Sequence, residues 1–113
     1  MWIWSALMPH PPILIHEVGK GRDNEAAKTL NGIKDLTSGL KKPDLLLVLS
    51  PHQQYAPGAL LVNTANAYRG SFAMFGVPDV KINAVSSGEA LKTLCDYLAK
   101  SGTAIYAESF ENL

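Results

Sequence analysis

The chain has 113 residues, a length typical of one domain. Hydrophobic residues make up 47% of it and charged residues 18%, a composition that favours a folded protein over a disordered one. Ten basic residues balance ten acidic ones, which argues against a nucleic-acid or membrane partner held by bulk charge. The same balance removes net repulsion between copies, so it is compatible with self-association.

The cellular location follows from the cysteine count and the N-terminal residues. Cys95 is the one cysteine, so an intrachain disulfide is excluded and nothing points to an oxidising compartment. Residues 1–8 are apolar but contain no basic residue, and they lead directly into His10-Pro11-Pro12. That pattern fits neither a signal peptide nor a membrane span, so we expect a cytoplasmic protein.

The first half of the chain predicts a strand, a helix and a second strand. Residues 2–8 form a short apolar run that ends at prolines, which favours a buried strand. Apolar residues at spacings of three and four between Ala26 and Leu40 predict an amphipathic helix. Leu45-Leu46-Leu47-Val48-Leu49 is typical of a strand buried on both faces, as in parallel sheets. Together these elements predict a βαβ unit.

The second half predicts shorter elements. Residues 59–63, 80–84 and 103–107 indicate strands, and residues 68–72 and 75–78 indicate loop or hairpin structure. A helix is expected to begin at Ser86, because Ser86 and Glu89 have the spacing of a capping box. The chain as a whole therefore predicts an α/β fold, with a mostly parallel βαβ-containing sheet and flanking helices, in a single domain over residues 1–113. Because residues 108–113 show neither a tail-like composition nor a stop, we expect this domain to be a fragment of a longer one.

Two histidines follow the predicted strands of the βαβ unit. His10 comes after the strand at 2–8, and His52 comes after the strand at 45–49. Ligands of open α/β sheets bind outside the carboxyl ends of the strands, where two imidazoles can reach one metal ion. A single histidine in a loop is more often solvated or hydrogen-bonded locally. The matched positions of the two favour a metal site.

An ordered set of short motifs resembles a known family. These motifs are Met8-Pro9-His10-Pro11-Pro12-Ile13, Glu17-Val18-Gly19-Lys20-Gly21, Pro43-Asp44, Ser50-Pro51-His52 and Arg69-Gly70-Ser71-Phe72 with Phe75-Gly76. The set is similar to the catalytic B-subunit family of class III extradiol ring-cleavage dioxygenases, in its uncharacterised bacterial branch related to the Memo proteins. The resemblance covers residues 3 to 107 and corresponds to the N-terminal part of the family's domain, which implies a larger three-layer α/β/α fold.

The resemblance implies a non-haem Fe(II) site of the two-histidine, one-carboxylate kind. In that family the two matching histidines bind iron, so His10 and His52 are the expected ligands. The iron binds a catechol-type aromatic substrate and activates O₂, and the ring opens beside the diol. Pro11, His16 and Gln53 are candidates for the surrounding pocket, although a histidine at position 16 is also explained by solvent exposure or a backbone contact.

The chain departs from this family in its missing catalytic groups. The family's carboxylate ligand and acid–base histidine lie in a part of the domain that these residues do not include, so no catalytic residue is assigned. The nearby acidic candidates, Glu17, Asp23, Glu108 and Glu111, do not match the family's ligand. We therefore expect an incomplete dioxygenase site, with a C-terminal half or partner chain supplying the rest, and homo-oligomerisation. The alternative is a non-catalytic, Memo-like binding module that uses the same strand-end cleft.

Overall fold

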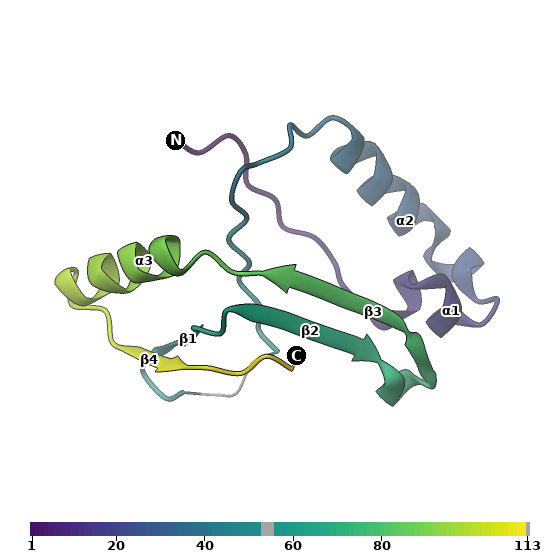
Figure 1. The fold of residues 1–113 in the computed structure, drawn as a ribbon. Helices are drawn as coiled ribbons and strands as arrows, with labels where there is room; N and C mark the ends of the chain where they lie inside the picture. The colour runs from purple at the N-terminus through teal and green to yellow at the C-terminus, as the bar shows by residue number, and fades with distance from the viewer. Residues whose placement is uncertain (53–55, 113) are drawn as a thin grey trace. The chain divides into compact units, whose positions relative to one another are not determined.

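The computed structural model describes residues 1–52 and 56–112 (Figure 1). The chain divides into two compact units. Unit 1 contains Met1–Leu46 and Phe72–Val80, and unit 2 contains Leu47–Ser71 and Lys81–Leu113. The prediction of a single domain, as part of a longer one, stays a prediction.

Unit 1 is built around one long helix. It contains a short 3-10 helix, η1 (Pro12–Leu14), a single helical turn, α1 (His16–Gly19), and the helix α2 (Asp23–Ser38). The helix expected from the apolar spacing is thus confirmed. Helix α2 contacts η1, and Ala26 on its apolar side is buried at 6% exposure. Ala26 is therefore the position at which the apolar side of this helix is buried.

A left-handed backbone turn separates α1 from α2. Lys20 caps α1 with φ 49° and ψ 47°, and Gly21 follows with φ 85°. The Lys20 amide donates to the His16 carbonyl and so closes the turn. A residue with a Cβ atom is strained in this region, whereas glycine is not.

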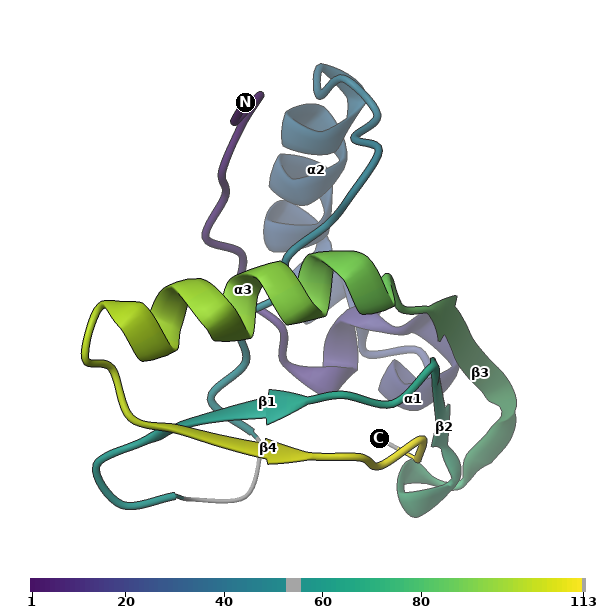
Figure 2. The ribbon, with the colours of Figure 1, turned by 60° about the vertical axis from the view of Figure 1, so that its left-hand side comes forward.

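Unit 2 contains a parallel pair of strands. β1 (Leu60–Asn63) pairs in parallel with β4 (Ile105–Glu108), in a register that sets Leu60 opposite Ile105 and Asn63 opposite Glu108. The connection between these strands includes α3 (Gly88–Lys100), which contacts β4 and lies along one side of the pair (Figure 2). Val62 of β1, at 9% exposure, and the following Ala65, at 2%, form the small core.

A hairpin lies between β1 and α3 in the chain. Its strands are β2 (Ala67–Phe72) and β3 (Val77–Val85), joined through a 3-10 turn, η2 (Ala73–Phe75), and they form an antiparallel two-stranded sheet. Gly76 closes the turn with φ 82°, a left-handed conformation that glycine adopts without strain. The predicted hairpin and the strand near 80–84 are therefore present.

The start of α3 differs from the predicted capping box by one residue. Ser87, not Ser86, is the N-cap, and its Oγ accepts a hydrogen bond from the Ala90 amide at 3.3 Å. The Ser86 hydroxyl is engaged elsewhere, since it donates to the Ala65 carbonyl at 2.6 Å. The local pattern predicted Ser86 as the N-cap, but its hydroxyl instead forms a tertiary hydrogen bond to the loop after β1.

The predicted first βαβ unit is wrong in its strands. Residues 2–8 and 45–49 are neither helix nor strand, and no described strand pairs with them. A strand exists only as part of a hydrogen-bonded ladder, so β-type composition is not enough without a partner. The α/β class is confirmed, but the parallel crossover runs from β1 to β4, and the second sheet is antiparallel rather than part of a mostly parallel one.

The side chain of Asn63 clamps the end of β1 to the segment after β4. Its Nδ2 donates to the Phe110 carbonyl at 2.8 Å, and its Oδ1 accepts from the amides of Phe110 and Ala65 at 3.2 and 3.1 Å. The Thr64 amide adds a 2.8 Å bond to the Glu108 carbonyl. One amide side chain therefore binds backbone groups of a residue that lies 47 positions later in the chain.

We expect Asn63→Ala to lower the free energy of unfolding by about 2–3 kcal/mol, because two backbone amides and one carbonyl lose their partner in a half-buried place. Urea denaturation followed by circular dichroism measures this change. Asn83→Ala is the control, since Asn83 is an exposed residue of β3, and it should change stability by less than about 0.5 kcal/mol. Equal effects of the two substitutions would contradict the role of the clamp.

We expect Lys20→Gly to raise stability by about 0.5–1 kcal/mol, since glycine relieves the left-handed strain at φ 49°. The matched control is Lys34→Gly in the middle of α2, which should lower stability by about 1 kcal/mol because glycine is a poor helix former. Thermal and urea unfolding of both variants check the opposite signs. A loss of stability at both positions would show that Lys20 is not strained.

Candidate functional site

His10 lies in unit 1, in an exposed segment that is neither helix nor strand. Its Nδ1 is 3.3 Å from the carbonyl oxygen of Met8. Because a carbonyl oxygen can only accept, this contact requires a hydrogen on Nδ1. A backbone carbonyl that orients one ring nitrogen in this way is a common feature of metal-binding histidines.

His52 lies in unit 2, in an exposed turn after Leu49. Its backbone amide donates to the Ser50 hydroxyl at 3.2 Å, a short local contact that shapes the turn. Pro51 further restricts the backbone before the imidazole. Gln53, the neighbouring pocket candidate, lies outside the described residues.

The other two pocket candidates surround the start of the first helices in unit 1. Pro11 is exposed and forms the N-cap of η1, and its carbonyl accepts from the Leu14 amide at 3.0 Å. His16 is the exposed first residue of α1, and its carbonyl accepts the Lys20 amide at 3.2 Å. His16 therefore has a structural function in closing the turn, whatever its ring contacts.

The expected metal ligands thus belong to different units. His10, Pro11 and His16 are in unit 1, and His52 is in unit 2. Across residues 1–52 and 56–112, no group of three or more His, Cys, Asp or Glu side chains is placed to hold a metal ion. A complete two-histidine, one-carboxylate shell of the kind that holds Fe(II) is therefore not found among the described residues, and no reaction step through iron is derived from them.

The acidic candidates do not change this result. Glu17 is in the first turn of α1, and Glu111 lies 3.9 Å from the Arg69 guanidinium as an exposed ion pair. Glu108 is in unit 2, on β4. The side chain of Asp23 lies outside what the structure describes. A carboxylate ligand for the two histidines is not found among these residues.

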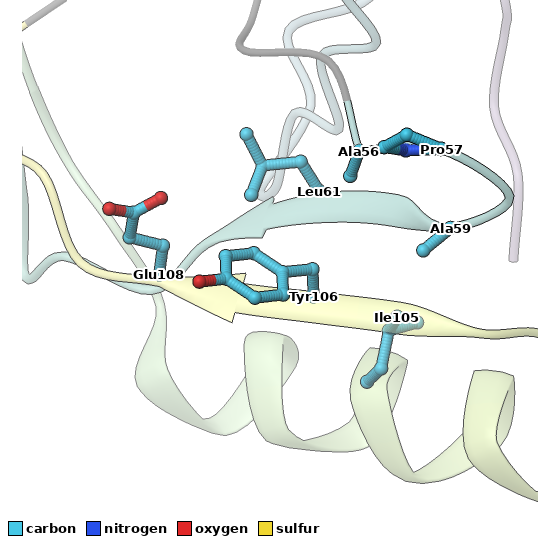
Figure 3. A pocket seen from close by; sticks show the side chains of 7 residues that line it. All are labelled: Ala56, Pro57, Ala59, Leu61, Ile105, Tyr106 and Glu108. Atoms are coloured by element: carbon cyan, nitrogen blue, oxygen red, sulfur yellow. The ribbon is translucent and has the colours of Figure 1, made fainter.

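A separate hollow lies within unit 2, on the side of the β1–β4 pair away from α3 (Figure 3). It has a volume of about 410 Å³ and is lined by Ala56, Pro57, Ala59, Leu61, Ile105, Tyr106 and Glu108. Leu61 and Tyr106 are direct cross-strand partners, and Glu108 follows two residues later on the same side. The hollow is open and combines a carboxylate and a phenol with apolar side chains.

The sequence did not predict this hollow. Glu108 was a candidate only for a metal ligand, and no function was predicted for Tyr106. Alternation along the expected strand at 103–107 was the available signal, since residues 106 and 108 share one face of a strand. The pairing of Tyr106 with Leu61 could not be predicted from the sequence, because it depends on which strand pairs with β4.

Among the described residues, the displaced pKa values arise from exposed ion pairs on helices. Two hydrogen bonds, at 3.1 and 2.9 Å, join Arg22 to Glu25 at the start of α2; they raise the pKa of Arg22 and lower that of Glu25, with charge attraction as the second cause. On α3 the 2.6 Å hydrogen bond from Lys92 to Asp96, followed by charge attraction, raises the pKa of Lys92. Solvent screens such pairs, so these shifts do not mark catalytic groups.

Comparison with known proteins adds one relative. The chain is 24% identical over 119 aligned residues to Protein CA_C1420 of Clostridium acetobutylicum. The match covers 90% of this chain but 25% of the relative, so the chain spans about a quarter of that protein's length. No family model matches the chain, and no solved structure matches it. Within the described residues, no helix is both long and apolar enough to cross a membrane.

The contact of His10 with Met8 leads to a spectroscopic prediction. In the neutral imidazole, we expect the Nδ1–H tautomer to dominate at His10, because only that tautomer can donate to the Met8 carbonyl. Long-range ¹H–¹⁵N correlation spectra distinguish the two ring nitrogens directly. His10→Gln identifies the resonances by their disappearance, and a dominant Nε2–H form at His10 would contradict the observed contact.

Proposed function

We propose that the chain is the histidine-bearing N-terminal part of a non-haem Fe(II)-dependent extradiol dioxygenase that acts on catechol-type substrates with O₂. The observation that carries the proposal is the ordered set of motifs from Met8 to Gly76, which includes both expected iron ligands. The match of 90% of this chain to a quarter of a longer relative agrees with a region that is part of a larger protein. The orientation of the His10 ring by a backbone carbonyl also supports a ligand function for Nε2.

In this proposal the chain contributes two imidazoles and the remaining groups come from elsewhere. His10 and His52 provide the nitrogen ligands, while the carboxylate ligand and the acid–base histidine come from a C-terminal half or a partner chain. Pro11 and Pro51 flank the two histidines, and their restricted backbone reduces the entropy lost when the imidazoles are held in place. The compartment expected for such an enzyme is the cytoplasm.

We expect the isolated chain to bind Fe(II) weakly, at about one ion per chain, since two ligands form an incomplete shell. His10→Ala and His52→Ala should each reduce the affinity at least about tenfold, and the double variant should lose little more, because both rings hold the same ion. Equilibrium dialysis under anaerobic conditions measures this binding. Asp35→Ala, which removes an exposed side chain of α2, is the control and should bind as the unchanged chain does. Independent, additive losses from His10 and His52 would indicate separate sites and contradict the proposal.

The second candidate is a Memo-like module that binds a ligand without turnover. It requires an exposed cleft beside the same histidines that accepts a ligand without turnover. The two functions differ in one measurement on a version of the protein that includes a C-terminal half. Ring-opening of catechols that depends on His10 and His52 would support the dioxygenase, whereas Fe(II)-independent ligand binding without ring cleavage would support the module.

A further inference from the structure

The hollow on the β1–β4 pair is lined by unit 2 alone, since all of its lining residues belong to that unit. One wall is the turn Ala56-Pro57-Gly58-Ala59, in which the Ala59 amide donates to the Ala56 carbonyl at 3.1 Å. Gly58 has φ 71° and follows a proline, which is typical of a type II turn. The wall is therefore held in place by the turn's own backbone.

Glu108 contributes a carboxylate from a fixed position on β4. Its backbone carbonyl accepts two hydrogen bonds from Thr64, one from the amide at 2.8 Å and one from the hydroxyl at 3.2 Å. The residue is half-buried. In the part of the chain that the structure describes, its carboxylate forms no ion pair and no hydrogen bond. A partly buried carboxylate has lost some of its hydration, so a cationic ligand gains a charge-assisted hydrogen bond there.

Tyr106 and Leu61 contribute apolar surface beside this carboxylate. They are direct cross-strand partners, and Figure 3 shows both side chains on the same side of the strand pair as Glu108. Tyr106 precedes Glu108 by two residues, the spacing at which side chains share one face of a strand. An aromatic ring packs against apolar groups and also attracts a nearby cation to its face. The hollow thus combines one negative charge with an aromatic and an aliphatic surface.

We propose that this hollow binds small organic amines. The protonated amino group pairs with the Glu108 carboxylate, and the apolar body of the ligand lies against Tyr106 and Leu61. The hollow has a volume of about 410 Å³, within the range of small-molecule sites.

Charge and ligand number exclude the other classes of small ligand. The carboxylate repels an anion, and a neutral ligand leaves this charge without a counter-charge. A divalent metal ion needs several oxygen ligands, whereas the hollow offers one carboxylate. An organic cation is the class that uses both the charge and the apolar surface.

Titration of the full chain with benzylamine, followed by ¹H–¹⁵N correlation spectra, tests the proposal. Saturable shifts are expected at the amides of residues 56–61 and 105–108, with a dissociation constant on the order of 1 mM for so small a ligand. Benzyl alcohol has nearly the same shape but no charge. It should bind at least about tenfold more weakly, because it forms no ion pair with Glu108.

Glu108→Gln retains the size of the side chain and removes its charge. It should weaken benzylamine binding at least about tenfold, to the level of benzyl alcohol. An amide spectrum with unchanged dispersion excludes misfolding as the cause. Glu89→Gln is the matched control, since Glu89 is an exposed residue in the first turn of α3 and does not line the hollow. This variant should bind benzylamine as the unchanged chain does.

Equal binding of benzylamine and benzyl alcohol would overturn the proposal, as would equal effects of Glu108→Gln and Glu89→Gln. The absence of saturable shifts at residues 56–61 and 105–108 up to about 20 mM benzylamine would also overturn it. The inference does not rest on the proposed iron chemistry, because neither His10 nor His52 lines the hollow. Loss of Fe(II) binding with intact amine binding would contradict the proposed function alone.

Discussion

The described structure depends on how the backbone of the C-terminal segment is paired. β4 joins β1 in parallel, the Thr64 amide continues the ladder to Glu108, and the Asn63 side chain holds Phe110 by two hydrogen bonds and Ala65 by a third. These contacts connect residues far apart in the chain and therefore close a long loop, which costs conformational entropy. The hairpin and α3 lie within that loop in the chain. Loss of the Asn63 hydrogen bonds would therefore destabilise unit 2 as a whole rather than one turn.

The same requirement for backbone pairing explains the exposed run Leu45–Leu49. β1 and β4 find their hydrogen-bond partners within unit 2, whereas this run finds none among the described residues. Its composition is more strand-like than that of Ile105–Glu108, which does form a strand. A β-type composition favours strand formation, but a sheet forms only where a second strand is available for pairing.

The proposed metal site has a similar incompleteness at the level of side chains. His10 has a backbone carbonyl that orients its ring, and His52 sits in a turn bounded by Ser50 and Pro51. A third ligand is not grouped with either residue in the described part of the chain. The clostridial relative, of which the match covers a quarter, shows a comparable region within a much longer protein.

The sequence by itself determined the local elements. Apolar spacing located α2, the Ser-rich start and the apolar face located α3 within one residue of its cap, and turn residues located the hairpin at Gly76. These features depend on contacts a few residues apart, which a linear pattern contains. Tertiary structure alone decided which strands exist, that Ser86 bonds to Ala65 instead of capping α3, and that Tyr106 and Glu108 share a hollow with Leu61. Each of these outcomes depends on which distant segments contact each other. The free energy of such a contact cannot be derived from the sequence of either segment alone.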